Sequence, residues 1–222
     1  MSDKIKIEKK VLSENDRIAG EIRQKLKQHK IPSFNMVSSP GSGKTSLLEK
    51  TLAHFKDRYN IAVVAGDVQT ENDANRLIAA GGHIIRPIVT NGMCHLDASM
   101  VEKSMAEFEL DQIDLFVIEN VGNLVCPSSY DLGEDMKVVL ISTTEGDDKP
   151  LKYPGMFRRS SVMVINKIDL IEHCDFSVDV VKKNAHQING ELEIFETSCR
   201  NGEGLALWFD WLENLIKSKK ES

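Results

Sequence analysis

Hydrophobic positions along the chain form two kinds of pattern that alternate. Short runs rich in Val, Ile and Phe are typical of strands buried on both faces, and they occupy residues 34–37, 61–65, 115–118, 137–142 and 161–165. Longer amphipathic stretches are typical of helices, and they occupy residues 13–30, 44–55, 73–80, 96–108, 178–188 and 205–217. This alternation predicts an α/β fold of three layers, with a mostly parallel central sheet and helices on both faces.

The first amphipathic stretch precedes the first strand. Ile18, Ile22 and Leu26 recur every four residues, and Ser13 with Asp16 is similar to the cap that begins a helix. Because 222 residues fit one α/β domain, we expect residues 1–222 to form a single nucleotide-binding domain with an N-terminal helix at about 13–30. The basic end, residues 217–222, is expected to be a frayed tail.

A glycine-rich segment, SSPGSGKT at residues 38–45, lies between the first predicted strand and the next predicted helix. This is the context of a phosphate-binding loop, whose backbone N–H groups and helix N-terminus bind phosphate oxygens. Lys44 is predicted to contact the β- and γ-phosphates, and the Thr45 hydroxyl to ligate Mg²⁺. Ser38 stands where the usual pattern has a glycine. The predicted nucleotide-binding residues of this segment are Gly41, Ser42, Gly43, Lys44, Thr45 and Ser46.

The segment NKID at residues 166–169 follows another buried run and predicts the choice of base. The Asp169 carboxylate can accept hydrogen bonds from guanine N1–H and the exocyclic amine, and adenine offers no such pair. Lys167 can lie across the base plane, and Asn166 can connect this loop to the phosphate-binding loop. Ser198 and Cys199, at the end of the next expected strand, can supply a backbone N–H to the guanine oxygen. The motif therefore predicts GTP as the nucleotide.

The run DLFVIENVG at residues 114–122 predicts a sensor of the γ-phosphate, because it is similar to the second switch of GTPases. Glu119 is predicted to hold Mg²⁺ or its water, and the Gly122 N–H to sense the γ-phosphate. Asn123 stands where Ras-type proteins have the glutamine that orients water. Asp67, at the end of another strand, is therefore a candidate for catalysis and for Mg²⁺ ligation. An aspartate in that place can also simply cap a helix or a loop.

A group of sulfur and imidazole ligands is also suggested by the sequence. Cys94 and His95 are adjacent, and Cys126 lies four positions after Gly122. Thiolate and imidazole together suit Zn²⁺ or Ni²⁺. Spacing alone leaves two interpretations open, a metal site or buried thiols with no ligand role. Position favours the metal site, because a ligand so near Gly122 would move with the sensor.

Composition and charge narrow the classes of partner. The chain has 28 Lys and Arg against 34 Asp and Glu, a net charge of -6, which argues against a nucleic-acid-binding protein. No apolar run approaches the ~20 residues of a membrane span, and the first ten residues lack the apolar core of a signal peptide. We therefore expect a cytoplasmic protein with reduced cysteines and no nucleic-acid or membrane partner.

Taken together, six segments resemble the HypB family, SIMIBI-class P-loop GTPases that incorporate nickel into hydrogenase. The resemblance extends from about residue 33 to residue 215, and the segments are SSPGSGKT, GDVQT, NGMCHLD, ENVGNLVCP, TEGDDKPLKYP and NKIDL. The resemblance implies a GTP-hydrolysing metallochaperone and a homodimer formed with GTP. It implies Cys94, His95 and Cys126 as nickel or zinc ligands at the subunit interface. It also implies a HypA-type nickel metallochaperone and the hydrogenase large subunit as partners, with Lys149 or Lys152 contacting the neighbour's nucleotide.

Two features depart from parts of this family. Some members bind nickel tightly through an N-terminal cysteine cluster or a histidine-rich tract, whereas the first cysteine here is Cys94, so tight storage is not expected. The relative that serves urease has a Cys-Pro-His arrangement. Here His95 follows Cys94 directly, and Pro127 follows Cys126 without a histidine, which argues against a role in urease maturation.

Two other functions are compatible with the sequence. One is a nucleotide-switch binding module of the same class, with structural thiols and no metal delivery. The other is a P-loop phosphotransferase acting on a small molecule, although guanine recognition argues against it. Metal-dependent dimerisation or turnover would separate the metallochaperone from the first alternative. Release of free phosphate without an acceptor would separate it from the second.

Overall fold

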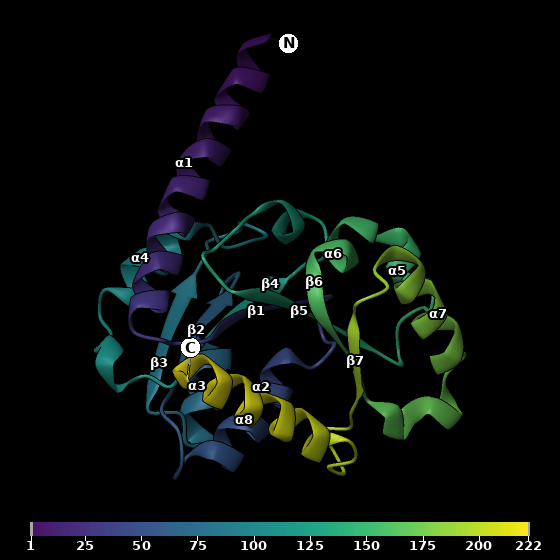
Figure 1. Cartoon of the computed structure of the whole chain (residues 1–222). Helices are drawn as coiled ribbons and strands as arrows, with labels where there is room; N and C mark the ends of the chain where they lie inside the picture. Colours follow the sequence, from purple (N-terminus) through teal and green to yellow (C-terminus); the bar gives the residue numbers. More distant parts are fainter. Residues whose placement is uncertain (1, 222) are drawn as a thin grey trace.

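A seven-stranded sheet runs through the molecule, in the order β3-β2-β4-β1-β5-β6-β7 (Figure 1). The computed structural model describes the backbone of residues 2–221 and the side chains of residues 10–221. Every neighbouring pair of strands is parallel, so the predicted class of fold is confirmed. The strands are β1 (Ser33–Ser38), β2 (Ile61–Asp67), β3 (Ile84–Val89), β4 (Leu115–Gly122), β5 (Met136–Ser142), β6 (Ser160–Asn166) and β7 (Glu193–Glu196).

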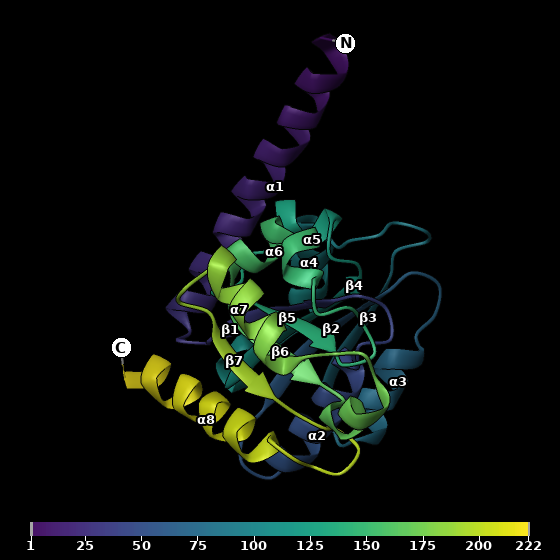
Figure 2. The ribbon, with the colours of Figure 1, turned by 90° about the vertical axis from the view of Figure 1, so that its right-hand side faces the viewer.

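Helices cover both faces of this sheet. Helices α2, α3 and α8 pack on one face, and α1, α4, α6 and α7 on the other (Figure 2). Within residues 2–221, no helix is both long and apolar enough to cross a lipid bilayer. The helices are α1 (Ser2–Gln28), α2 (Lys44–Phe55), α3 (Asn72–Ala79), α4 (Ala98–Met105), α5 (Lys149–Lys152), α6 (Pro154–Arg159), α7 (Val178–Ile188) and α8 (Leu205–Glu221).

Side chains of the central strands are buried on both faces, since successive residues of a strand point to opposite sides. On the α2 and α8 face, the Trp208 ring contacts Phe34 and Phe195, with ring centroids 6.1 and 5.9 Å away. Its indole N–H is also satisfied, because it donates to Thr51 Oγ1 over 3.0 Å. With both faces occupied by apolar packing, the ends of the strands are where polar groups gather.

Of the two edge strands, one was not predicted and the other was predicted without bounds. All five predicted strands are present and longer than expected. The edge strand β3 was not predicted, because Arg86 and Pro87 interrupt its apolar pattern and it is only half-buried. The other edge strand, β7, was expected only as the strand before Ser198, without bounds. Edge strands need less apolar surface than central ones, so hydrophobicity alone detects them poorly.

The predicted start of the first helix is wrong. Helix α1 begins at Ser2, eleven residues before Ser13, and the Ser13 hydroxyl donates to Lys10 O within the helix instead of capping it. No Gly or Pro interrupts residues 2–12, and their Lys and Glu are good helix formers. The expected frayed tail is wrong for the same reason: α8 continues to Glu221. The helix predicted at 96–108 is shorter, because Asp97 caps it by accepting from Met100 N.

Helix α1 contributes to the core through its second half, while its first half extends away from the sheet (Figure 1). Ile22 is fully buried beneath the sheet face, whereas Val11 is 53% exposed. We expect Ile22→Ala to lower the free energy of unfolding by about 2–5 kcal/mol, through lost burial and a cavity. Urea unfolding measures this, with Val11→Ala as the matched control on the same helix. Equal effects of the two substitutions would show that α1 is not part of the folded domain.

Candidate functional site

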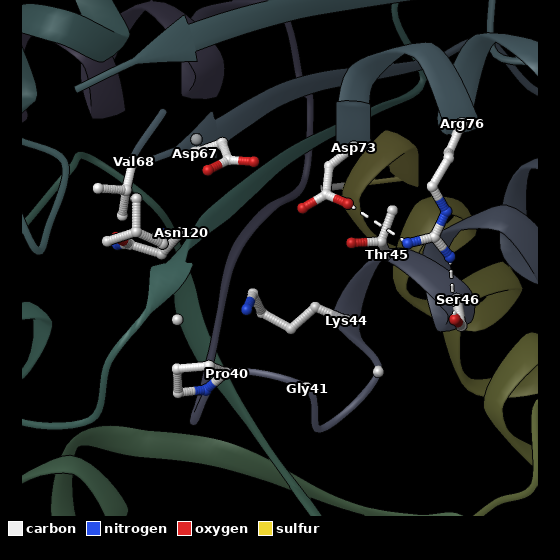
Figure 3. A pocket seen from close by; sticks show the side chains of 14 residues that line it. Pro40, Gly41, Lys44, Thr45, Ser46, Asp67, Val68, Asp73, Arg76 and Asn120 are labelled. Carbon is white, nitrogen blue, oxygen red and sulfur yellow. Dashed lines mark hydrogen bonds and ion pairs between the residues drawn. The ribbon is translucent and has the colours of Figure 1, made fainter. Parts of the chain in front are cut away.

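A cavity of about 400 Å³ opens at the carboxyl edge of the sheet, where β1, β2 and β4 end (Figure 3). This edge is where open α/β sheets bind ligands. The loop after β1 and the start of α2 form its floor, and residues after β2 and at the end of β4 form its walls. The lining residues are Pro40, Gly41, Gly43, Lys44, Thr45, Ser46, Gly66, Asp67, Val68, Asp73, Arg76, Asn120, Val121 and Gly122.

The turn before α2 depends on Gly43. Its φ of 107° is in the left-handed region, and a Cβ there would lie 2.3 Å from Asn166 Nδ2. The next residue, Lys44, is buried and donates to Ser38 Oγ over 3.0 Å. Ser38, which replaces the usual glycine, therefore holds the lysine ammonium inside the loop. Burial lowers the pKa of Lys44, so a bound anion would relieve an unfavourable environment.

Glu119 faces the start of α2 from the end of β4. Its Oε1 accepts from Thr45 Oγ1 over 2.6 Å, and its Oε2 is buried with no hydrogen-bond partner among the described residues. Burial raises the pKa of Glu119 to about 7, although the nearby Lys44 charge opposes that shift. A hydroxyl beside a carboxylate oxygen with free lone pairs is a donor set that suits a hard cation such as Mg²⁺. The two predicted ligands, Thr45 and Glu119, are thus brought into direct contact.

Asp67 lies on the same cavity as these two residues (Figure 3). Its carboxylate accepts from Gln69 N over 3.2 Å and from Thr70 Oγ1 over 2.9 Å. Burial pushes the pKa of Asp67 upward, but these hydrogen bonds outweigh it and hold the pKa below the usual range. Asp67 is therefore an ionised carboxylate at the cavity that also caps its own loop, and its role in catalysis and Mg²⁺ ligation stays a prediction.

Two charged lining residues, Asp73 and Arg76, are among those that were not predicted. Both come from α3, where Asp73 Oδ1 lies 3.3 Å from Arg76 Nη1. Arg76 Nη2 donates to Ser46 Oγ over 3.1 Å, which connects α3 to the phosphate-binding loop. In Figure 3 the Asp73 carboxylate faces the same space as Thr45. Their only signal in the sequence was the position of this helix directly after the segment GDVQT, at the carboxyl end of β2.

A second cavity, of about 560 Å³, adjoins the first and shares Gly41, Gly43 and Ser46 with it. The predicted base-recognition residues line or support it. Asn166 Nδ2 donates to Ser42 O over 3.0 Å, and Asn166 Oδ1 accepts from Cys199 N over 3.4 Å. These two bonds connect the phosphate-binding loop, the NKID loop and the loop after β7.

The NKID loop contributes a lysine and a carboxylate to the lining of this second cavity. Lys167 has a positive φ of 62° and its Nζ donates to Gly41 O over 2.7 Å. Asp169 Oδ1 accepts from Ser198 Oγ over 2.6 Å. Burial raises the pKa of Cys199 to about 11, so this thiol is neutral. Every predicted base-recognition residue is thus gathered at one cavity next to the phosphate-binding loop.

Gly122 ends β4 directly against the phosphate-binding loop. A Cβ at this position would lie 2.9 Å from Pro40 Cα, so the contact requires glycine. The neighbouring Asn123 faces away from the nucleotide cavity, because its Nδ2 donates to Cys94 O over 3.1 Å. Gly122 thus touches the phosphate-binding loop, while the next side chain contacts the loop that carries Cys94.

Cys94, His95 and Cys126 come together although 30 residues lie between the last two. All their candidate ligand atoms lie within 4.8 Å of one another. The two Sγ atoms are 3.0 Å apart, and Cys94 Sγ is 3.8 Å from His95 Nδ1. The His95 ring packs on Tyr130, with ring centroids 4.1 Å apart. The hydrogen bond to Cys126 raises the pKa of Cys94, so metal binding must displace a proton.

Lys149 and Lys152, on α5, differ in their surroundings. Lys149 Nζ lies 2.9 Å from Glu145 Oε2 and donates to Ser39 Oγ over 3.0 Å, so it is held on its own phosphate-binding loop. Lys152 pairs with Asp148 over 2.7 Å, and its side chain is 61% exposed. Of the two lysines, Lys152 is the one that points into solvent.

Comparison with known proteins gives consistent matches. The family model described as the CobW/HypB/UreG nucleotide-binding domain matches residues 32–196. Hydrogenase maturation factor HypB of Rhizobium leguminosarum bv. viciae is 47% identical over 94% of this chain and 70% of that protein. Hydrogenase/urease maturation factor HypB of Helicobacter hepaticus is 45% identical over 94% of this chain and 87% of that protein.

Solved structures are similar over nearly the whole fold. HypB from Archaeoglobus fulgidus has a TM-score of 0.86 at 38% identity, covering 92% of this chain and 100% of that one. HypB from Helicobacter pylori, in complex with nickel, has a TM-score of 0.86 at 41% identity, covering 93% and 97%. A LAO/AO transport system kinase, with a TM-score of 0.56 at 17% identity, shares the fold.

The raised pKa of Glu119 predicts a pH dependence of stability. Between the ordinary pKa of 4.5 and about 7, the folded state keeps a proton on Glu119 that the unfolded chain has already released. The stability from this group is therefore present below pH 4.5 and is lost as pH rises towards 7. Relative to Glu119→Gln, the nucleotide-free protein should lose on the order of 3 kcal/mol between about pH 5 and pH 8. Urea unfolding across this range checks it, and a constant difference between the two proteins would contradict it.

Proposed function

This chain belongs to the HypB hydrogenase maturation factors of the CobW/HypB/UreG family, and from that premise we propose that it hydrolyses GTP to deliver nickel to the nickel–iron centre of hydrogenase. One observation carries the proposal. The γ-phosphate sensor and half of the Cys/His group belong to one short segment, from Glu119 to Cys126, and the other half is hydrogen-bonded to that segment through Asn123. A nucleotide-dependent movement of Gly122 therefore acts directly on the metal ligands.

The proposed reaction is attack of water on the γ-phosphate of GTP, giving GDP and phosphate. Lys44 stabilises the charge on the phosphates, and the N–H groups of the loop bind their oxygens. Mg²⁺, held by Thr45, Glu119 and Asp67, would neutralise charge on the phosphates. Asp67 is our candidate for orienting the attacking water, since Asn123 is turned away from the cavity.

Nickel is the proposed cargo of Cys94, His95 and Cys126. Two thiolates and an imidazole are ligands that nickel and zinc both accept, and the nickel complex of the H. pylori relative favours nickel. Since metal binding needs reduced thiols, the proposal places the protein in the cytoplasm. The partners are a HypA-type nickel metallochaperone and the hydrogenase large subunit. A relative of similar identity is named a hydrogenase/urease maturation factor. Nickel transfer to apo-urease but not to apo-hydrogenase would therefore contradict hydrogenase as the recipient of the nickel.

We also propose a homodimer that forms when GTP is bound. The second switch lacks a water-orienting glutamine, and Lys152 is exposed on a segment next to the nucleotide site. Lys152 is therefore our choice for the residue that reaches the neighbour's nucleotide, because Lys149 is held on its own loop. Its exposure and charge suit a contact with nucleotide across a subunit interface.

The choice of base is tested by Asp169→Asn. The substitution replaces an acceptor with a donor facing guanine N1–H, so GTP affinity should fall by at least ~10-fold. Xanthosine triphosphate, which presents an oxygen in place of the exocyclic amine, should bind this variant better than it binds the wild type. Calorimetry measures both affinities. Equal affinity of the wild type for ATP and GTP would contradict the assignment of Asp169.

Coupling of metal to nucleotide is tested by nickel titration of wild type, Cys94→Ser and Cys126→Ser, each with GDP and with a non-hydrolysable GTP analogue. We expect the wild type to show two nickel affinities that differ by about 5- to 150-fold, as is ordinary for coupled sites. Both serine variants should bind nickel weakly in either state. Light scattering on the same samples should show a larger species with the GTP analogue.

A nucleotide-switch module with structural thiols predicts another result for the same titration. Nickel would bind all three proteins alike, and the nucleotide state would not change its affinity. Cys174→Ser is the matched control, because Cys174 is a free, half-buried thiol outside the Cys/His group. It should bind nickel as the wild type does.

A further inference from the structure

Two asparagines flank the sensor glycine and bind the loop that carries the metal ligands. Asn120 Oδ1 accepts from Leu96 N over 3.2 Å, directly after His95 in the chain. Asn123 Nδ2 donates to Cys94 O over 3.1 Å. Both bonds join the end of β4 to the loop between β3 and α4. Neither side chain is a candidate ligand for the metal, although Asn120 also lines the nucleotide cavity.

Asn120 reaches this loop because β4 presents opposite faces at successive residues. Glu119 points towards α2 and contacts Thr45, whereas Asn120 points to the other side of the sheet, towards Leu96. The register between β1 and β4 shifts between the pairs Met36↔Glu119 and Ser38↔Gly122, so β4 contains an extra residue there. Such bulges re-aim side chains near functional sites. Adjacent residues of one strand therefore contact the nucleotide cavity and the metal loop.

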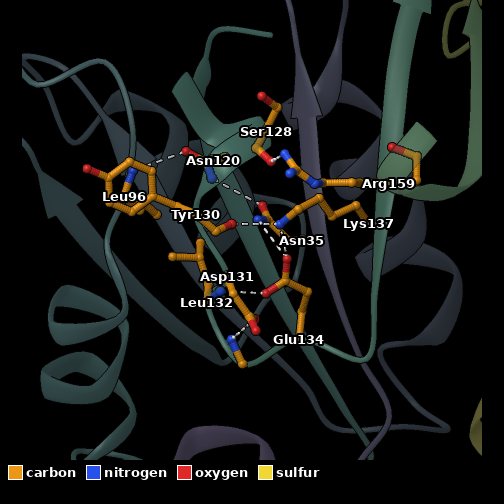
Figure 4. A network of polar contacts seen from close by, with 12 residues as sticks. Asn35, Leu96, Asn120, Ser128, Tyr130, Asp131, Leu132, Glu134, Lys137 and Arg159 are labelled. Atoms are coloured by element: carbon orange, nitrogen blue, oxygen red, sulfur yellow. Dashed lines mark hydrogen bonds and ion pairs between the residues drawn. The ribbon is translucent and has the colours of Figure 1, made fainter. Parts of the chain in front are cut away.

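The orientation of the Asn120 amide is fixed by a buried polar network (Figure 4). Its Nδ2 donates to Asn35 Oδ1 over 3.3 Å, and Asn35 Nδ2 donates to Glu134 Oε1 over 3.3 Å. The Glu134 carboxylate only accepts, and it also pairs with Lys137. Both amides must therefore turn their nitrogens towards Glu134. This leaves the Asn120 oxygen to accept from Leu96 N and from Val121 N, so the contact with the metal loop is specified and not incidental.

The network also returns to His95 by a second route. Lys137 Nζ donates to Tyr130 O over 2.9 Å, and the Tyr130 ring packs on His95, with ring centroids 4.1 Å apart. The backbone after His95 is held through Asn120, and its ring is held through Tyr130. The imidazole is therefore positioned from both sides by groups anchored to the same buried Glu134–Lys137 pair.

Asn123 contacts both halves of the Cys/His group. While its Nδ2 holds Cys94 O, its Oδ1 accepts from Val125 N over 2.9 Å, the residue before Cys126. A single amide thus spans the two backbone segments whose sulfur atoms lie 3.0 Å apart. It directly follows Gly122, so a displacement of that glycine changes the position of this bridge first.

We propose that Asn120 and Asn123 are positioning residues that transmit movement of Gly122 to the Cys94–Cys126 spacing, and so determine how strongly the nucleotide state changes nickel affinity. This inference rests on the proposed function, since it assigns the carriers of the proposed coupling. It also gives a role to the residue that replaces the water-orienting glutamine: Asn123 serves the metal group instead of the attacking water.

A static role predicts a different outcome from this transmitting role. If Asn123 only held Cys94 in place, its removal would lower nickel affinity by the same factor with GDP and with the GTP analogue. If it transmits movement, the ratio of the two affinities must itself decrease. The ratio is therefore the quantity that separates transmission from simple structural support.

The experiment is a nickel titration of full-length wild type, Asn123→Ala and Asn120→Ala, each with GDP and with a non-hydrolysable GTP analogue. Asn189→Ala is the matched control. Asn189 is half-buried, its Oδ1 accepts from Glu191 N over 3.1 Å and its Nδ2 donates to Ser160 O over 2.8 Å. It thus makes the same two kinds of hydrogen bond as Asn123. It makes them at the start of β6, at the amino end of that strand, whereas both cavities lie at the carboxyl ends of the strands.

The affinity ratio of Asn123→Ala should be smaller than that of the wild type by roughly 2- to 12-fold, the equivalent of one net hydrogen bond. Asn120→Ala should act in the same direction, and Asn189→Ala should keep the wild-type ratio. Asn123 is only half-buried, so its variant keeps the test valid even where the buried Asn120 variant fails to fold. Circular dichroism verifies folding of each protein.

Each result has one meaning. A wild type with a single nickel affinity in both nucleotide states overturns the proposed coupling, and this inference with it. A wild type with two affinities, together with an Asn123→Ala variant of unchanged ratio, overturns the inference and leaves the proposed function standing. A reduced ratio in Asn189→Ala of the same size as in Asn123→Ala also overturns it, because the effect would then not be specific to the metal loop.

Discussion

The buried carboxylate of Glu119 is the constraint on which the arrangement of both sites depends. An ionised carboxylate is unfavourable away from water, and here it is offset by the Thr45 hydroxyl and the nearby charge of Lys44. The end of β4 and the start of α2 are thereby held together. Any charged group that enters the cavity changes this balance. Since β4 lies between β1 and β2 and pairs with both as far as Glu119, most of the strand is fixed. Beyond Glu119 it pairs only with β1, at Gly122, so residues 120–123 are the ones that can respond.

The parts of the site that could be predicted from the sequence are those whose chemistry is local. The segments 38–45 and 166–169 each contain their whole functional unit, so a strand, a loop and a few side chains are enough to identify them. The Cys/His group was predicted with two interpretations, because its halves lie on different loops. Only the order of β3, β2 and β4 in the sheet brings those loops to one edge.

Other features could not be predicted, for physical reasons that differ from one residue to the next. Asp73 and Arg76 enter the cavity because the turn after β2 directs α3 towards the phosphate-binding loop, and no local pattern encodes that direction. The role of Asn120 depends on the shifted register of β4, which hydrophobic alternation does not reveal. The early start of α1 was missed because good helix formers without an apolar stripe give no periodic signal.

The composition of the Cys/His group also has a consequence for how fast an ion can leave it. One chain supplies three ligand atoms, and Cys94 among them is exposed. A four-coordinate ion held there keeps at least one position for a donor from outside the chain. An incoming ligand can bind at that position before a sulfur or nitrogen ligand of the site dissociates from the ion. Exchange then never passes through a bare ion, which suits the proposed transfer of nickel to another protein.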